Sequence, residues 1–516
     1  MHQMALISSI IYLTGFTHKN NMASKNRLDK IVSLSKARGF IFQSSEIYGG
    51  LSAVYDYGPL GVELKRKLNQ AWWTSMTQKH ENIVGLDAAI LMHPTVWKAS
   101  GHVDSFSDPM IDDKQSKMRY RADLLIEEHI AKLQQNGNEE RAEQIQTLLD
   151  TSGTRKSMNE DLYDIIMEEQ IKGPDSGAFD WTEVRQFNLM FKTQFGATAT
   201  GEDSEVYIRP ETAQGIFVNF VNALNTTRQQ VPFGIAQIGK AFRNEVVARQ
   251  FVFRMREFEQ MEMQYFVKPG TDSDEYQRWK QQRFNWHKDI GIRPSKLRFH
   301  DHPEDKLAHY AKEAVDVQYE FPIGWQEVEG IHNRTDFDLG AHQKFSGKKM
   351  EYFDPRTQER YIPYVVETSV GLDRTLLMVL CDAYREEQVP GDKEGTVETR
   401  TVLKMHPRLA PITAGIFPLI KKPELQEVAR KIYEELAEDH KVQYDEKGSI
   451  GKRYRRLDEA GTPFCITVDF DGLEDQTVTI RDRDTMQQER IAIDKVGEVI
   501  RSRMKNWSPQ DDPDAV

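Results

Sequence analysis

The sequence is poor in cysteine and lacks long hydrophobic runs. Its 516 residues include only two cysteines, Cys381 and Cys465. Two thiols so far apart exclude a disulfide framework and indicate a reducing compartment, so we expect a cytoplasmic protein. The apolar stretch at residues 5–16 is shorter than the roughly 20 residues that a membrane-spanning helix needs. No Lys or Arg precedes it, which argues against a signal peptide. The sequence predicts no membrane association.

Charged residues of both signs are abundant. The chain has 68 Lys and Arg against 80 Asp and Glu, a formal net charge of −12. An acidic total argues against nucleic-acid binding over the whole surface, but it allows a local basic groove. Met22 opens the first well-patterned segment, so we interpret residues 1–21 as a disordered extension.

Shifts in composition divide the chain into several units. Residues 112–180 are charged and helix-like, strand patterning dominates 184–224, and a second helical stretch is expected at 275–316. The α+β organisation that we predict has these parts: a disordered extension at 1–21, a main domain at 22–111 and 181–390, a helical insert at 112–180, a linker at 391–404, an α/β domain at 405–505, and a tail at 506–516.

One apparent motif is a decoy. The segment "GIAQIGKA" at residues 234–241 nearly matches a phosphate-binding loop, but Ala241 stands where a magnesium-binding hydroxyl is needed. Strand-like alternation also continues beyond it, where a phosphate-binding loop would lead into a helix. We therefore do not expect a P-loop nucleotidase.

A charged stretch with strand-like alternation lies at residues 239–266, "GKAFRNEVVARQFVFRMREFEQMEMQYF". We predict a β-hairpin whose loop is 243–250 and whose second strand begins at Val252, with Arg254, Arg256 and Phe258 on one face. A solvated amphipathic hairpin would explain this pattern. A pocket for a polyanion with an aromatic ring and an amino group would also explain it, since arginine forks hold phosphate and a carboxylate holds an ammonium or a metal.

A third arginine follows in "VETSVGLDRTLLMVL", residues 366–380. This segment predicts a strand, a glycine turn and a helix with Arg374 near its start. Helix N-termini attract anions. The alternative is a buried helix with an incidental arginine.

Together these segments resemble motifs 2 and 3 of class II aminoacyl-tRNA synthetases. The motifs "SEIYGGLSAVYDYGPLGVELKRKL", "WKASGHVDSFSDPMID", "RPETAQGIFVNF", "GIHNRTDFDL" and "ETSVGLDR" are similar to those of the dimeric, single-chain glycyl-tRNA synthetases. The resemblance covers nearly the whole chain from Met22. It implies an antiparallel catalytic sheet flanked by helices and a C-terminal anticodon-binding domain.

The resemblance also implies an activity. The family uses ATP and Mg²⁺ to form glycyl-adenylate and then charges tRNA-Gly, as a homodimer. Because the glycine carboxylate is already ionised, its attack on the α-phosphorus needs alignment and charge stabilisation but no general base.

By resemblance, particular residues carry each role. The catalytic residues are Arg243, Glu245 and Arg374. The ATP-binding residues are Arg243, Asn244, Glu245, Phe253, Arg254, Met255, Arg256, Glu257, Phe258, Glu327, Val328, Gly371, Leu372, Asp373 and Arg374, with Glu327 as the magnesium ligand. The glycine-binding residues are Arg121, Glu211, Phe258, Glu259, Gln260, Met261, Glu262, Glu367, Thr368, Ser369, Val370 and Gly371.

The sequence departs from the family pattern in the insert. Many relatives carry two Cys-x-x-Cys pairs there, but the matching positions are Asp113, Ser116, Gly173 and Ser176. These side chains do not suit a structural zinc site, so we predict that the insert folds without zinc. A smaller departure is Thr368, where relatives often have proline.

Two other functions fit parts of the sequence. A non-catalytic, synthetase-like nucleic-acid-binding subunit would lack the arginines of motifs 2 and 3, but Arg243, Arg256 and Arg374 are all present. An ATP-dependent ligase that joins an amino acid to a small amine would not need an anticodon-binding module. A tRNA-charging assay separates the latter from a synthetase.

Overall fold

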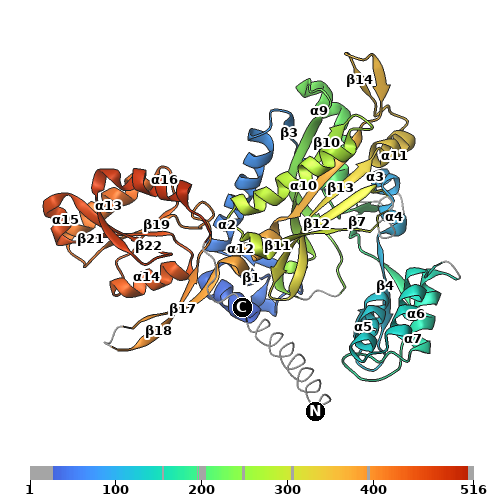
Figure 1. Ribbon diagram of the computed structural model, residues 1–516, viewed down its shortest axis with the longest axis horizontal. Coiled ribbons are helices and arrows are strands. Elements are labelled where there is room, and N and C mark those ends of the chain that lie inside the picture. Colours follow the sequence, from blue (N-terminus) through green and yellow to red (C-terminus); the bar gives the residue numbers. More distant parts are fainter. Residues whose placement is uncertain are drawn as a thin grey trace, which may run out of the picture.

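The computed structural model describes residues 27–509, except 154–155, 195, 197–204, 247–249, 304–306, 309 and 392–394. The predicted extension at 1–21 and the end of the predicted tail lie outside the described residues. Figure 1 shows three parts: a central sheet with helices, a helical insert, and a C-terminal α/β unit on the opposite side. Within the described part of the chain, no helix has the length and apolar character needed to cross a membrane.

The centre is a seven-stranded sheet in the order β11-β12-β13-β16-β10-β9-β3. All of its neighbouring strands are antiparallel except β3, which pairs parallel to β9. Its strands are β3 (Ile83–Gly85), β9 (Phe233–Phe242), β10 (Glu257–Val267), β11 (Leu297–Asp301), β12 (Glu313–Phe321), β13 (Gly324–Thr335) and β16 (Tyr364–Gly371).

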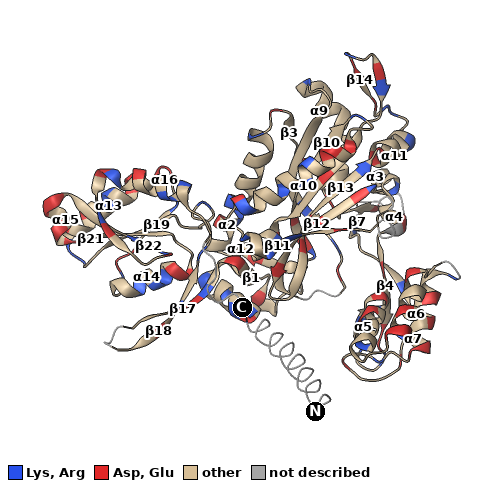
Figure 2. Ribbon diagram, viewed as in Figure 1, with Lys and Arg blue, Asp and Glu red and all other residues tan. Residues whose placement is uncertain are grey.

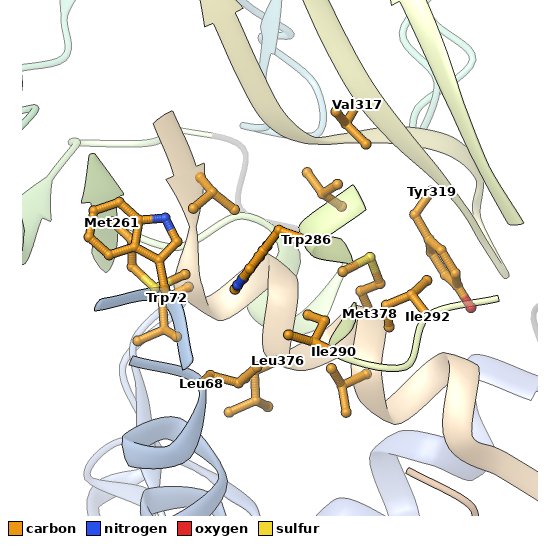
Figure 3. Close-up of a cluster of buried hydrophobic side chains, with 14 of the residues drawn as sticks. Leu68, Trp72, Met261, Trp286, Ile290, Ile292, Val317, Tyr319, Leu376 and Met378 are labelled. Carbon is orange, nitrogen blue, oxygen red and sulfur yellow. The ribbon is translucent and has the colours of Figure 1, made fainter. Parts of the chain in front are cut away.

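One face of the sheet is covered by α2 (Pro59–Trp73), α10 (Asp272–Asp289) and α12 (Leu372–Ala383). Alternate residues of the strands, such as Met261 and Val317, pack there against Trp72 and Leu376. Figure 3 shows this cluster between the helices and strands. Because alternate residues point to opposite faces, the even-numbered residues of β10, from Phe258 to Gln264, lie on the other face. That face carries the functional cavity.

The insert has its own hydrophobic core. Helices α5 (Ala122–Gln135), α6 (Glu139–Asp150) and α7 (Met158–Glu168) pack together around residues such as Ile126 and Ile145. The sequence predicted only helices at 112–180, but the insert also includes a small sheet. Its strands are β4 (Ser107–Asp112), β5 (Arg119–Arg121) and β6 (Arg185–Asn188).

Four positions that carry cysteine in many relatives converge at the base of the insert. Asp113 is 1% exposed, and its Oδ2 accepts hydrogen bonds from Ser116 Oγ at 2.8 Å and Ser176 Oγ at 2.5 Å. A Cβ on Gly173 would lie 2.4 Å from the same oxygen. These hydrogen bonds lower the pKa of Asp113 to about 2. The carboxylate therefore links the two chain segments.

We expect Asp113→Ala to lower the melting temperature of the insert by several degrees, whereas chelator treatment should leave the wild-type melting curve unchanged. Because the folded pKa of Asp113 lies below its ordinary value of 3.8, its contribution to stability is complete above that pH and declines as the pH falls toward 2. Circular dichroism at several pH values measures both effects. Elemental analysis that found one stabilising zinc per chain would contradict this account.

The predicted linker at 391–404 is wrong as a description of its conformation. Strands β17 (Tyr384–Pro390) and β18 (Val397–Leu403) pair over their whole length as a hairpin. The polar composition reflects a hairpin that extends away from the core (Figure 1). Arg400 of β18 is 1% exposed and donates to Asp458 of the C-terminal unit at 2.8 Å. The hairpin therefore supports the domain that follows it.

The C-terminal unit confirms the predicted α/β alternation. Its five-stranded sheet has the order β20-β19-β21-β22-β23. The strands are β19 (Ala414–Pro418), β20 (Val442–Tyr444), β21 (Phe464–Val468), β22 (Thr477–Asp482) and β23 (Gln488–Ala492), and the helices are α13 (Pro423–Ala437), α14 (Ile450–Glu459), α15 (Phe470–Asp475) and α16 (Val496–Asn506).

Three further expectations about local structure were wrong. The strand patterning predicted through 224 gives way to helices α8 (Ala213–Val218) and α9 (Phe220–Thr227). The second helical stretch ends at Asp289, and most of 297–321 is strand. The second strand of the charged hairpin begins at Glu257, because 251–253 form a turn of 3-10 helix. In each case apolar spacing alone did not distinguish a short helix from a strand.

Candidate active site

A cavity of about 220 Å³ lies on the sheet face opposite α10. It is bounded by the β9–β10 hairpin, β13, β16 and the first turn of α12. Its lining residues are Glu211, Arg243, Glu245, Val252, Phe253, Arg254, Met255, Phe258, Gln260, Glu262, Tyr310, Glu327, Val328, Gly330, His332, Arg334, Glu367, Ser369, Gly371, Asp373 and Arg374. Strand β9 runs unbroken through the apparent phosphate-loop motif, which confirms that this motif is a decoy.

Arginines line one part of the cavity, and aromatic rings hold two of them in place. The guanidinium of Arg243 lies 5.3 Å from the ring centre of Phe258, and its Nε donates to Pro210 O at 3.1 Å. Arg374 lies 4.4 Å from the ring centre of Phe253 and donates to Glu327 at 3.1 Å. Cations held in this way can bind phosphate oxygens without reorganising.

A β-bulge places two consecutive residues of β13 in the cavity. Val317 pairs with Glu329, but the next residue, Gln318, pairs with Glu327, so Val328 is an extra residue. Both Glu327 and Val328 line the cavity, although alternation alone would put only one of them there. The bulge therefore brings a carboxylate beside Arg374.

Glutamates line another part of the cavity. Glu211 lies 3.3 Å from His102 Nε2, Glu262 accepts from Thr212 Oγ1, and Glu367 accepts from Gln264 Nε2 at 2.6 Å. Three carboxylates in one small cavity repel one another, so they do not all ionise at the same pH. The arrangement suits an ammonium group, which can donate three hydrogen bonds.

The environment separates the pKa values of these glutamates. Burial raises the pKa of Glu262 well above its usual value, and the charges of Glu367 and Glu211 raise it further. Burial opposes the ionisation of Glu367 as well, but Arg334 and His332 hold its pKa below the usual range. Burial likewise opposes the ionisation of Glu211, but His102 lowers its pKa to about 2. Glu262 is therefore the member of the group that is most easily protonated.

Sequence reasoning missed five residues that line the cavity. Arg334 is 4% exposed and donates to both oxygens of Glu367 at 3.2 Å and to Asp338 at 2.7 Å. His332 Nδ1 lies 2.9 Å from Glu367. The other three are Val252, Tyr310 and Gly330. Three of the five lie in the segment "GIHNRTDFDL", whose alternating polar residues were the available signal.

Several predicted site residues do not line the cavity, so their assigned roles have no geometric support here. Arg121 pairs with Asp108 at 3.4 Å at the base of the insert. Glu259 faces α2, where Lys65 lies at 2.6 Å. The remaining predicted residues outside the lining are Asn244, Arg256, Glu257, Met261, Thr368, Val370 and Leu372. All other predicted site residues line the cavity, and their individual roles stay predictions.

Three family descriptions match successive parts of the chain. "Glycyl-tRNA synthetase insertion domain 1" matches residues 108–152 and 138–189. "tRNA synthetase class II core domain (G, H, P, S and T)" matches 191–383, and "Anticodon binding domain" matches 413–503. These segments coincide with the insert, most of the central sheet with its cavity, and the C-terminal α/β unit.

Whole-length relatives agree with this division. The chain is 57% identical to a protein of Chlorobaculum tepidum named glycine–tRNA ligase, over 92% of this chain and 100% of that protein. It is 51% identical to a glycine–tRNA ligase of Treponema denticola, over 94% of this chain and 98% of that protein. A glycine–tRNA ligase of Caldanaerobacter subterraneus is 50% identical over 94% of this chain and all of its own length. With that identity and coverage, and with a class II core built around an arginine- and glutamate-lined cavity, the chain belongs to the glycine–tRNA ligase family.

Proposed function

We propose that this protein forms glycyl-adenylate from glycine and ATP and then transfers glycine to the 3′-terminal adenosine of tRNA-Gly. The observation that carries the proposal is the division of one cavity into an arginine-lined part and a glutamate-lined part. The first part suits the phosphates of ATP and the second suits the glycine ammonium. Their proximity lets the carboxylate of glycine approach the α-phosphorus.

The residues have separate tasks in this reaction. Arg243 neutralises the α-phosphate and the attacking carboxylate, Phe258 stacks on adenine, and Arg374 binds the γ-phosphate. Glu327 is exposed in the cavity and would offer Mg²⁺ the oxygen ligand that it prefers. Bound magnesium would supply charge neutralisation on the phosphates of ATP. Glu211, Glu262 and Glu367 accept from the ammonium.

ATP–pyrophosphate exchange tests the first step. We expect exchange with glycine and little with alanine or serine, because His332, Arg334 and Tyr310 line the cavity beside the glutamates and limit the room for a side chain. Comparable exchange with alanine would contradict the substrate assignment. Charging of tRNA then separates a synthetase from a ligase that acts on small amines, and absence of both activities would favour the non-catalytic subunit.

We further propose a cytoplasmic homodimer, as the resemblance implies, and light scattering of the purified chain tests the dimer. The C-terminal domain is proposed to hold the anticodon stem of tRNA-Gly through α14, where Figure 2 shows clustered basic residues. Tyr454 and Arg453 are not available for this contact. Tyr454 bonds Thr467 at 2.8 Å, and Arg453 is 3% exposed and donates to Pro418 O at 2.7 Å.

Lys452 and Arg456 of α14 are exposed and are proposed as tRNA contacts, although Arg456 also pairs with Asp445 at 2.6 Å. We expect the double variant Lys452→Glu/Arg456→Glu to raise the KM for tRNA about tenfold and to weaken its salt dependence, because two phosphate contacts become repulsive. Glycine-dependent pyrophosphate exchange should not change. Lys431→Glu, on the exposed surface of α13, is the matched control. Unchanged tRNA kinetics in the double variant would place the contact elsewhere.

A further inference from the structure

A buried ionic cluster lies directly behind the ATP part of the cavity, on the opposite face of the sheet. Glu329 of β13 is fully buried, and its two oxygens contact different side chains of α10. Arg283 Nε donates to Oε1 at 2.5 Å, and His287 Nε2 lies 2.8 Å from Oε2. Arg283 and His287 are four positions apart, so they lie on one face of the helix. None of the three lines the cavity.

The cluster is costly for the fold. Removing an arginine and a glutamate from water costs several kcal/mol per ion, and a well-packed apolar group in their place is often equally stable. Burial lowers the pKa of His287, and its ring donates Nε2–H to the Glu329 carboxylate. Within the described residues, Arg283 Nη2 and His287 Nδ1 have no hydrogen-bond partner. Stability alone does not account for a cluster with unsatisfied groups.

The position of Glu329 in the strand suggests what the cluster does. Glu329 is the first residue after the bulge, and it is paired on both sides, with Val317 and with Val370. In a strand without the bulge, residues 327 and 329 would point to the same face of the sheet. The observed strand instead turns Glu327 toward Arg374 and Glu329 toward α10. Because Glu329 is held on the helix side, the extra residue of the bulge must lie just before it, at Val328.

We infer that Glu329, clamped by Arg283 and His287, is a positioning residue that holds the bulge of β13 and thereby aims Glu327 at Arg374 and the ATP–magnesium site. The inference rests on the proposed function, since it concerns the same nucleotide subsite. A slip of one residue before Glu329 would turn the Glu327 carboxylate away from the cavity. The glycine part is built on Glu211, Glu262 and Glu367, with His332 and Arg334 of β13. Residues 329–333 pair with β16, beyond the bulge, so a slip confined to the residues before Glu329 leaves the glycine part in place.

The test is steady-state pyrophosphate exchange by Glu329→Gln. The amide cannot accept from both α10 donors, so the clamp is lost while size is kept. We expect the KM for ATP to rise roughly tenfold to a hundredfold, with a higher magnesium requirement, and the KM for glycine to stay within about twofold. His287→Gln retains a neutral donor to Glu329 and should keep the ATP KM close to that of the wild type.

Asp382→Asn is the matched control. Asp382 is also buried and accepts from Arg293 at 3.0 Å and Tyr319 at 3.1 Å, but it does not line the cavity. The Asp382→Asn variant should be less stable than the wild type, without a change in its KM for ATP. If Glu329→Gln does not fold, Arg283→Lys replaces it, because lysine keeps the charge and loses the planar fork. The inference fails if folded Glu329→Gln, or Arg283→Lys in its place, keeps a wild-type ATP KM, if its ATP and glycine KM values rise equally, or if Asp382→Asn has the same effect. Wild-type protein without glycine-dependent exchange would instead overturn the proposed function.

Discussion

Arg374→Ala and Arg243→Ala will each leave a folded protein that has lost most of its glycine activation. Each guanidinium is fixed by a ring and by a main-chain oxygen: Arg374 by Phe253, and Arg243 by Phe258 and Pro210. Removing such a preorganised donor from a developing charge costs about 2.7–4 kcal/mol, or roughly a hundredfold to a thousandfold in rate. Pyrophosphate exchange at saturating ATP measures the loss.

The control for these two variants is an arginine outside the cavity that also stacks on an aromatic ring. Arg298 of β11 lies 4.3 Å from the ring centre of Trp325 and donates to Gln318 at 2.8 Å, so Arg298→Ala also removes a stacked arginine. We expect normal exchange from this variant. Near-normal exchange in both Arg374→Ala and Arg243→Ala would refute the roles assigned to them.

Glu262→Gln will weaken glycine binding but leave the protein folded. The glutamine amide resembles the neutral carboxylic acid that the cavity favours, and it can bond Thr212 as Glu262 does. The folded state should therefore tolerate the change. Glycine should bind at least about tenfold more weakly, because its ammonium favours the ionised form of Glu262 and so a charged acceptor, whereas a glutamine amide cannot ionise. The KM for glycine in the exchange assay measures this effect.

The same variant has a defined dependence on pH. The folded pKa of Glu262 lies above its ordinary value of 4.5, so its contribution to stability is complete below that pH and is lost as the pH rises through the folded pKa. The difference in stability between Glu262→Gln and wild type should therefore move in favour of the variant as the pH rises above 4.5. A difference independent of pH would show that Glu262 ionises freely in the folded protein.

Local sequence was enough to predict many of the residues that line the arginine-rich part of the cavity. Arg243 follows directly after β9, and Arg374 lies in the first turn of α12, as the motifs predicted. Phe258 and Glu262 share one face of β10 because the strand alternates with period two. These features depend on residues close together in the chain, so pattern and motif could find them.

Other features depend on contacts between distant segments, and local pattern could not find them. The β13 bulge is defined by its register with β12, and the clamp on Glu329 comes from α10. The strand period predicted which face of the strand carries Glu259, but it gave no sign that Lys65 of α2 would form an ion pair with it. Arg334 was missed because a charged residue in a strand is ordinarily interpreted as exposed, but Glu367 and Asp338 pair with it inside the fold.

The sequence by itself determined the family, the order of the domains and the helix–strand alternation of the C-terminal unit. It also determined which arginines and glutamates are present in the segments that form the cavity. These features depend only on residue identity and local spacing. Tertiary structure alone decided which carboxylates share a cavity, which of them has a raised pKa, and that Asp113 and Ser176 meet across the insert. The physical reason is that burial and charge coupling act through space. A carboxylate ionises according to the groups within a few ångströms of it, and here those groups come from strands and helices far apart in the chain.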